Sequence, residues 1–144
     1  MILKDKVVVM VGGSQGFGKA LAELFIQEGS KVVIVSKNKE SAEKTAGEIG
    51  ATSFVADVRN EQSLRDMARS VGEQFGGIDI WVNSAGVFRI FPKSEISDME
   101  RAHELFDINF FGIVLGSRTA LPYMSEKGGV ILSMLSSAAL DATR

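Results

Sequence analysis

Cysteine is missing from this chain of 144 residues, and histidine, tryptophan and tyrosine each occur only once. Without cysteine the chain has no disulfide, no thiolate metal site and no cysteine nucleophile, which is typical of proteins in the reducing cytoplasm, where we expect this one. The single histidine, His103, argues against a histidine-based catalytic triad. The carboxylates show no metal-ligand spacing, so we predict no metal site.

Long apolar runs and a surplus of one charge are also absent. No apolar segment has membrane-spanning length, and the short one near the N-terminus ends in glycines, unlike a secretion signal. The formal net charge is -2 with both signs interspersed, so we expect neither a nucleic-acid nor a membrane partner. With 45% hydrophobic and 24% charged residues, the composition predicts one globular domain over residues 1–144.

Glycine, by contrast, is concentrated after the first apolar run. Residues 6–11 have the unbroken, β-branched pattern of a strand buried on both faces, and apolar residues recur at helical spacing over 16–28. A strand, a glycine turn and a helix in this order predict a diphosphate site, because backbone amides and the helix dipole can approach an anion where no Cβ intervenes. The alternative is a structural turn without a ligand. The glycines concerned are Gly12, Gly13, Gly16 and Gly18.

Strands and helices alternate along the rest of the chain, which predicts a parallel sheet with right-handed crossovers and ligands at the carboxyl ends of its strands. We expect the later strands at 31–36, 52–56, 78–82 and 130–135. We expect the later helices at 39–49, at about 61–75 behind an Asn60 cap, and from a Ser97–Glu100 capping box to about 124.

Five motifs at these positions resemble those of the short-chain dehydrogenase/reductase family. Residues 11–18 are similar to its Thr-Gly-x-x-x-Gly-x-Gly turn, with valine in place of threonine. Residues 57–58 resemble its Asp-Val pair, and residues 83–86 its Asn-Asn-Ala-Gly segment, with Ser84 as the second residue. Residues 109–112 resemble its Asn-x-x-Gly, and residues 135–137 its serine-bearing strand end. The resemblance covers essentially the whole chain and implies an α/β fold, a Rossmann-type doubly wound parallel sheet of about five strands.

The resemblance also implies hydride transfer between a nicotinamide dinucleotide and a carbonyl or alcohol substrate. Ser137, with Ser136 as the fallback, would bind the substrate oxygen, and Asn109 would hold a water of the proton relay. Asp57 and Val58 would contact the adenine. The implied cofactor-binding residues are Gly12, Ser14, Gln15, Gly16, Phe17, Gly18, Ser36, Lys37, Asp57, Val58, Asn83, Ala85 and Gly86.

The tyrosine and lysine that handle the proton in this family should follow the serine, and the chain stops at Arg144 before them. Tyr123 and Lys127 have the right spacing, but they precede the serine and come where the long helix ends, away from the cofactor. We therefore expect the front portion of such an enzyme, inactive alone. The alternative is a catalytically inactive module that binds a dinucleotide or self-associates. A methyltransferase is disfavoured, because Ser36 stands where that class carries an acidic residue.

The residues after the second strand bear on the choice of cofactor. An acidic residue there would bind the ribose 2′-hydroxyl of NAD, but this chain has Ser36, followed by Lys37 and Lys39. The positive charge favours the 2′-phosphate, so we predict NADP rather than NAD. The alternative is that these lysines only solubilise the loop.

Apolar residues of the long helix and the fifth strand would lie exposed without the family's later segments. We therefore expect a homodimer or larger homo-oligomer through this region. The aromatic loop at 87–94 suggests a partly apolar substrate. The helix residues concerned are Phe110, Phe111, Ile113, Val114 and Leu115.

Overall fold

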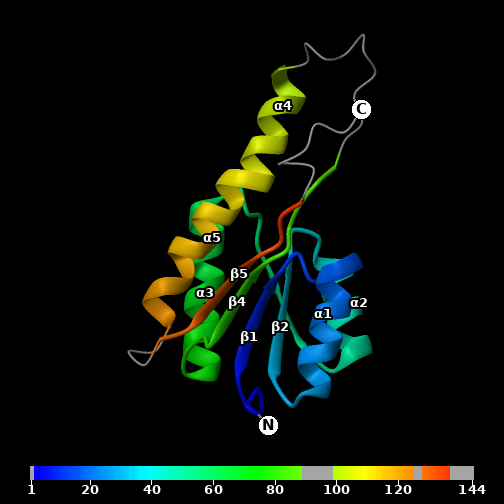
Figure 1. The fold of residues 1–144 in the computed structure, drawn as a ribbon, viewed down its shortest axis with the longest axis vertical. Helices are drawn as coiled ribbons and strands as arrows, with labels where there is room; N and C mark the ends of the chain where they lie inside the picture. The colour runs from blue at the N-terminus through cyan, green and yellow to red at the C-terminus, as the bar shows by residue number, and fades with distance from the viewer. Residues whose placement is uncertain (1, 89–98, 125–127, 137–144) are drawn as a thin grey trace.

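Five parallel strands form a single sheet in the computed structural model, which describes residues 2–88, 99–124 and 128–136 (Figure 1). The strand order is β3-β2-β1-β4-β5, so the direction of winding reverses between β1 and β4. This confirms the predicted doubly wound sheet, whose topological switch point lies between these two strands. The strands are β1 (Val7–Val11), β2 (Lys31–Ser36), β3 (Thr52–Val55), β4 (Ile80–Asn83) and β5 (Val130–Ser133).

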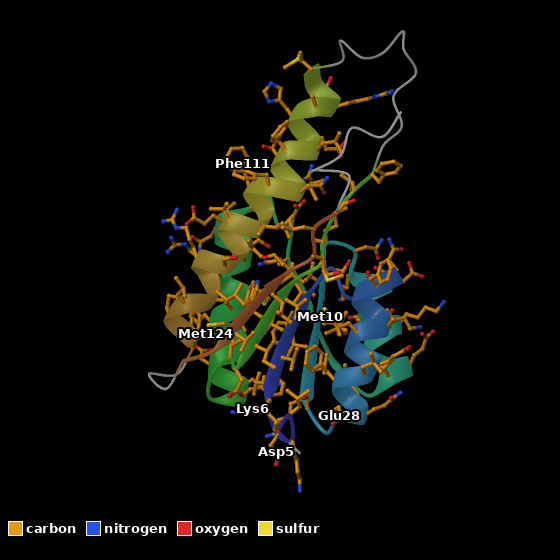
Figure 2. All side chains as sticks on the ribbon, viewed as in Figure 1. Asp5, Lys6, Met10, Glu28, Phe111 and Met124 are labelled. Atoms are coloured by element: carbon orange, nitrogen blue, oxygen red, sulfur yellow. The ribbon has the colours of Figure 1, made fainter. Side chains whose placement is uncertain are left out.

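The central strand β1 is buried on both faces, as its unbroken apolar run predicts. Its Val7, Val9 and Val11 belong to one core cluster, and Val8 and Met10 belong to the other. Figure 2 shows Met10 pointing from β1 toward the helix that packs on that face. β1 is therefore the central strand of the sheet, with helices packed on both of its faces.

Helices cover both faces of the sheet (Figure 1). Helices α1 (Gly16–Gln27) and α2 (Lys39–Ile49) lie on one face, and α3 (Glu61–Phe75) lies on the other. The caps follow the sequence signals, because the side chain of Asn38 accepts the Ser41 amide and that of Asn60 accepts the Ser63 amide.

The long helical segment expected to run to about residue 124 is divided into four pieces. These are α4 (Met99–Phe106), a π-helical turn η2 (Asp107–Phe111), α5 (Gly112–Ala120) and a 3₁₀ turn η3 (Leu121–Tyr123). Residue 97 of the expected capping box lies outside the described residues. A π turn inserts one extra residue into the helix and is typical of functional positions, and here it contains Asn109.

The strand β5 forms one edge of the described sheet, where it pairs only with β4. It ends at Ser133, two residues earlier than predicted. Apolar side chains of β5 and of the α4–α5 segment face outward, and Figure 2 shows Phe111 projecting from that segment. Among the residues described, no helix combines the length and apolarity needed to cross a membrane. The exposed apolar residues here are Phe106, Phe110, Phe111, Val114, Leu121, Val130, Leu132, Met134 and Leu135.

Candidate functional site

The glycine turn after β1 packs directly against the loop after β4. Gly12 has a φ of +86°, and a Cβ there would overlap the backbone of Ala85. A Cβ on Gly18 would overlap the carbonyl oxygen of Gly12 and come within 3.0 Å of Ser84 Oγ. The two loops close on each other only because these positions carry no side chain. The predicted crevice at the switch point is therefore built by contact between these two loops.

The first turn of α1 is open to an anion. Gln15 occupies the N-cap position but makes no side-chain cap hydrogen bond, and the first turn carries no acidic residue. The Ser14 carbonyl accepts a hydrogen bond of 2.8 Å from Thr45 Oγ1, which holds the turn against α2. The exposed amides and the positive end of the helix dipole thus suit a phosphate group.

Three hydroxyl groups gather where β2 ends. Ser36 Oγ lies 3.3 Å from Ser14 Oγ and 3.5 Å from Ser41 Oγ, and it accepts the Asn38 amide at 3.2 Å. Lys37 is exposed beside them. Ser41 was not among the predicted site residues, although the Asn38 cap places it in the first turn of α2, next to Ser36.

Lys39, the second lysine of the predicted positive charge, belongs to the helix rather than to this cluster. Its Nζ lies 3.7 Å from Glu43 Oε1, one helical turn away. Positive charge near the three hydroxyls therefore comes from Lys37.

Asp57, which follows β3, is held by the side chain of Arg59. The guanidinium donates to both carboxylate oxygens at 2.6–3.2 Å, and the Arg59 amide donates to Oδ1 at 3.0 Å. These hydrogen bonds lower the pKa of Asp57, although its partial burial opposes the shift. The neighbouring Val58 is buried against Gly112 of α5. Sequence reasoning missed Arg59, because a charged residue after Asp-Val carries no pattern of its own.

Asn83 is buried, and its side chain is used inside the protein. Its Oδ1 accepts from Trp81 Nε1 at 2.8 Å, and its Nδ2 donates to Ser117 Oγ at 3.1 Å and to Ser133 Oγ at 3.2 Å. Gly116 faces this amide without a side chain, because a Cβ there would overlap Asn83 Oδ1. Asn83 thus ties β4 to α5 and β5, and only the loop that follows it reaches the crevice.

The loop after β4 is fixed in place by Asn109. The Asn109 side chain accepts the Val87 amide and donates to the Val87 carbonyl, each at 2.8 Å. Gly86 lies against the same side chain, and Phe88 beyond it is 84% exposed. The π turn therefore aims the predicted proton-relay residue at the crevice loop, where both of its side-chain polar atoms are engaged.

Of the remaining predicted residues, the structure describes Ser136 and Phe17. Ser136 is exposed three positions beyond the end of β5, whereas Ser137 lies outside the described residues, as do positions 89–94 of the aromatic loop. Phe17, at the start of α1, is 81% exposed. Among the described residues no cluster of acidic or histidine side chains could hold a metal ion.

Tyr123 lies near the amino ends of the strands, at the opposite end of the sheet from the glycine turn. Its carbonyl accepts the Ile78 amide at 2.8 Å, just before β4 begins, and its ring packs against Gly72 of α3. Figure 2 shows the adjacent Met124 toward the end of the molecule where Lys6 leads into β1. Tyr123 therefore has a packing role far from the glycine turn.

A parallel sheet that reverses its winding beside a glycine turn defines the Rossmann class of dinucleotide-binding folds. The chain belongs to the short-chain dehydrogenase family, whose sequence profile matches residues 6–143. The oxidoreductases of this family use a nicotinamide cofactor, NAD or NADP. Gly16, at the start of α1, has open space where a Cβ would stand, so the backbone there is accessible and fits such a cofactor.

Three relatives illustrate this membership. An uncharacterized oxidoreductase of Staphylococcus aureus (strain USA300) is 32% identical over 149 residues, covering 99% of this chain and 63% of that protein. A mouse (Mus musculus) protein named 3-oxoacyl-[acyl-carrier-protein] reductase is 34% identical over 135 residues, covering 90% of this chain and 56% of that protein. The crystal structure of gox2181 superimposes with a TM-score of 0.92 at 28% identity, covering 98% of this chain and 57% of that one. The chain thus spans about three fifths of the length of the proteins it matches.

Proposed function

We propose that this chain is the dinucleotide-binding portion of an NADP-dependent oxidoreductase that acts on a carbonyl or alcohol. The observation that carries the proposal is the contact between the glycine turn and the loop after β4, where Gly12 and Gly18 leave no room for a Cβ. The first turn of α1 beside this contact has no side-chain cap and no acidic residue. A diphosphate is the anion that such an arrangement suits best.

Each part of the dinucleotide has a set of residues suited to it. Residues 12–18 would hold the diphosphate, Asp57 and Val58 would contact the adenine, and the loop at 83–86 would border the nicotinamide. The bound nicotinamide would supply the hydride. Ser137, or else Ser136, would hydrogen-bond the substrate oxygen.

Asn109 would fix the loop beside the reacting atoms through its two hydrogen bonds to Val87. Phe88 supplies exposed aromatic surface on the loop after β4, which supports a partly apolar substrate. The mouse relative's name makes a 3-oxoacyl thioester one reasonable test compound.

The preference for NADP is supported by the end of β2. The hydroxyl groups of Ser14 and Ser41 each lie within 3.5 Å of the Ser36 hydroxyl, and the exposed Lys37 adds a positive charge at this end of the strand. One opposite charge at about 4 Å contributes roughly 1–4 kcal/mol, depending on the local dielectric. Each 1.4 kcal/mol corresponds to about a factor of ten in affinity.

Calorimetric titration of the chain with NADPH and NADH tests the proposal. We expect NADPH to bind more tightly, and Lys37→Asp to reverse the preference. NADH binding more tightly, or Lys37→Asp without effect, would count against NADP, and no heat with either dinucleotide would count against the function itself.

Turnover of the chain alone should be very slow. Losing a positioned proton donor costs about 10² to 10⁴ in rate. NADPH oxidation should therefore be barely measurable with a panel of ketones, aldehydes and a 3-oxoacyl thioester. Fast turnover would contradict the role assigned to Tyr123, and its loss in Tyr123→Phe without unfolding would identify that residue as the acid.

The second candidate function is that of a catalytically inactive module that self-associates. It is supported by the exposed apolar side chains of α4–α5 and by the groove of about 460 Å³ beside them. Asp107 and Arg118 line the groove together with Phe111, Val114 and Leu115. Two copies packed antiparallel through this face would bring the Asp107 of each near the Arg118 of the other. Light scattering tests self-association, because a monomer at high concentration would contradict it, and NADPH oxidation distinguishes the two candidate functions.

A further inference from the structure

Arg59 occupies the carboxylate of Asp57 from one side with three N–H donors. Its Nε reaches both oxygens at 3.0 and 3.2 Å, its Nη2 reaches Oδ2 at 2.6 Å, and its amide reaches Oδ1 at 3.0 Å. A carboxylate accepts about four hydrogen bonds in all. The three donors leave room for about one further hydrogen bond, and the positive charge of the guanidinium makes the carboxylate a weaker acceptor for another donor.

The same carboxylate is the group that would recognise adenine under the proposed function. Asp57 directly follows Ala56 at the carboxyl end of the sheet, and its side chain is 28% exposed, so a purine can reach it. The 6-amino group of adenine is a hydrogen-bond donor and needs an acceptor. It would meet a carboxylate that is already engaged.

The guanidinium of Arg59 has acidic neighbours other than Asp57. Its raised pKa comes first from Asp57, but the carboxylates of Glu104 and Asp107 also raise it, so both lie within electrostatic reach. Arg59 and Asp107 line the same groove beside α4–α5. The guanidinium can therefore turn from Asp57 toward Asp107 without entering an apolar environment.

We propose that Arg59 competes with the 6-amino group of adenine for the carboxylate of Asp57 and thereby lowers the affinity for adenine dinucleotides. The inference rests on the proposed function, since it assumes a dinucleotide in the crevice. Arg59 is then a specificity-determining residue, because it weakens the binding of ligands that need the Asp57 carboxylate as an acceptor. The sign is unusual, because removing a positive charge beside an anionic ligand should tighten binding.

The test is calorimetric titration of NADPH into the wild-type chain and into Arg59→Ala. We expect the variant to bind about three- to fivefold more tightly, the gain that an exposed ion pair of ordinary strength allows. The matched control is Arg65→Ala, which removes a similar exposed pair, Arg65 Nη2 to Glu61 Oε1 at 2.6 Å, from the next helical turn. That variant should bind NADPH like the wild type.

A second ligand isolates the amino group. Nicotinamide hypoxanthine dinucleotide phosphate carries a 6-oxo group, which accepts rather than donates, so Arg59→Ala should give no gain with it. The gain with NADPH should also vanish in an Asp57→Asn background. If Arg59→Ala unfolds, Arg59→Lys keeps the charge but loses the two-pronged contact, and we expect a smaller gain in the same direction.

The outcomes distinguish failure of the inference from failure of the proposed function. If both chains bind NADPH and Arg59→Ala binds equally or more weakly, Arg59 does not compete with adenine and the inference is overturned alone. An equal gain with the 6-oxo ligand would also overturn it, because the effect would then be general electrostatics. Absence of binding by every variant would overturn the proposed function and the inference together.

Discussion

The carboxyl ends of β1 and β4 and the outer side of β5 with α4–α5 are two regions of opposite character. At the first, glycines leave no spare space, and Asn109 locks the loop with two hydrogen bonds. At the second, apolar side chains such as Phe111 and Leu132 face outward, and β5 has a partner strand on one side only within the described sheet. The first region is internally complete, whereas the second offers apolar area that another segment or molecule could bury.

The difference shows which property of the chain each region depends on. The carboxyl ends of β1 and β4 pack closely because Gly12 and Gly18 have no side chain, so adding one methyl group there should disrupt the contact. The outer side depends on exposed apolar area, so adding a charge there should alter association and leave the fold intact. The substitutions below test these two statements.

Gly18→Ala should have the largest effect. The new Cβ would overlap the Gly12 carbonyl and push the glycine turn away from the loop after β4. We expect loss of detectable NADPH binding and a fall of about 3 kcal/mol in the free energy of unfolding. Calorimetry and urea unfolding measure the two effects.

The control for this substitution is Gly47→Ala in α2. A Cβ at Gly47 meets nothing within 4 Å, and alanine favours a helix, so this variant should be stabilised by up to about 1 kcal/mol. Equal destabilisation by Gly18→Ala and Gly47→Ala would contradict the importance of close packing at Gly18.

Asn83→Ala should be next in size, because it tests the boundary between the two regions. The variant leaves the buried Trp81 N–H without its acceptor, and we expect a loss of about 2 kcal/mol in the free energy of unfolding. Trp81 is the only tryptophan, so its fluorescence emission should shift as the indole environment changes. Asn60→Ala, which removes an exposed helix cap, should cost about 1 kcal/mol and leave the emission unchanged.

Phe111→Asp addresses the outer side. A charge at this exposed position should weaken self-association by about tenfold or more, with little change in the unfolding midpoint of the monomer. Light scattering over a concentration series measures this. Leu24→Asp, at an exposed apolar position of α1 on the other face of the sheet, should leave association unchanged.

The smallest expected effect is the pH dependence from Asp57. Arg59 holds the pKa of this carboxyl below its ordinary value of about 3.9, so the pair stabilises the folded chain above that pH. The stabilisation is lost as the pH falls from about 4 through the lower folded value, and it amounts to less than about 1 kcal/mol because the pair is partly exposed. In Arg59→Ala this part of the stability profile should shrink, and the pKa of the Asp57 carboxyl measured by NMR should be higher than in the wild type.

Much of the framework follows from local sequence signals. The apolar run at 6–11 predicts a central buried strand, and Asn60 predicts a helix cap that the structure contains. The alternation of strands and helices, together with the glycine turn, is enough to predict the doubly wound sheet.

Other features had no local signal. The π turn at 107–111 was predicted as ordinary helix, because the spacing of its residues is helical and the break arises where Asn109 reaches back to Val87. Arg59 and Ser41 were missed for a similar reason. Their importance comes from neighbours on other segments, or from a side-chain conformation that spacing does not encode.

The sequence by itself determined the order of elements, the buried strand and the position of the glycine turn, because these depend on periodicity and on the conformational freedom of individual residues. Only the tertiary structure decided that Asn83 faces inward and that Asn109 holds the loop after β4. Those outcomes depend on contacts between segments that are distant in the chain, and such contacts exist only once the sheet has brought them together.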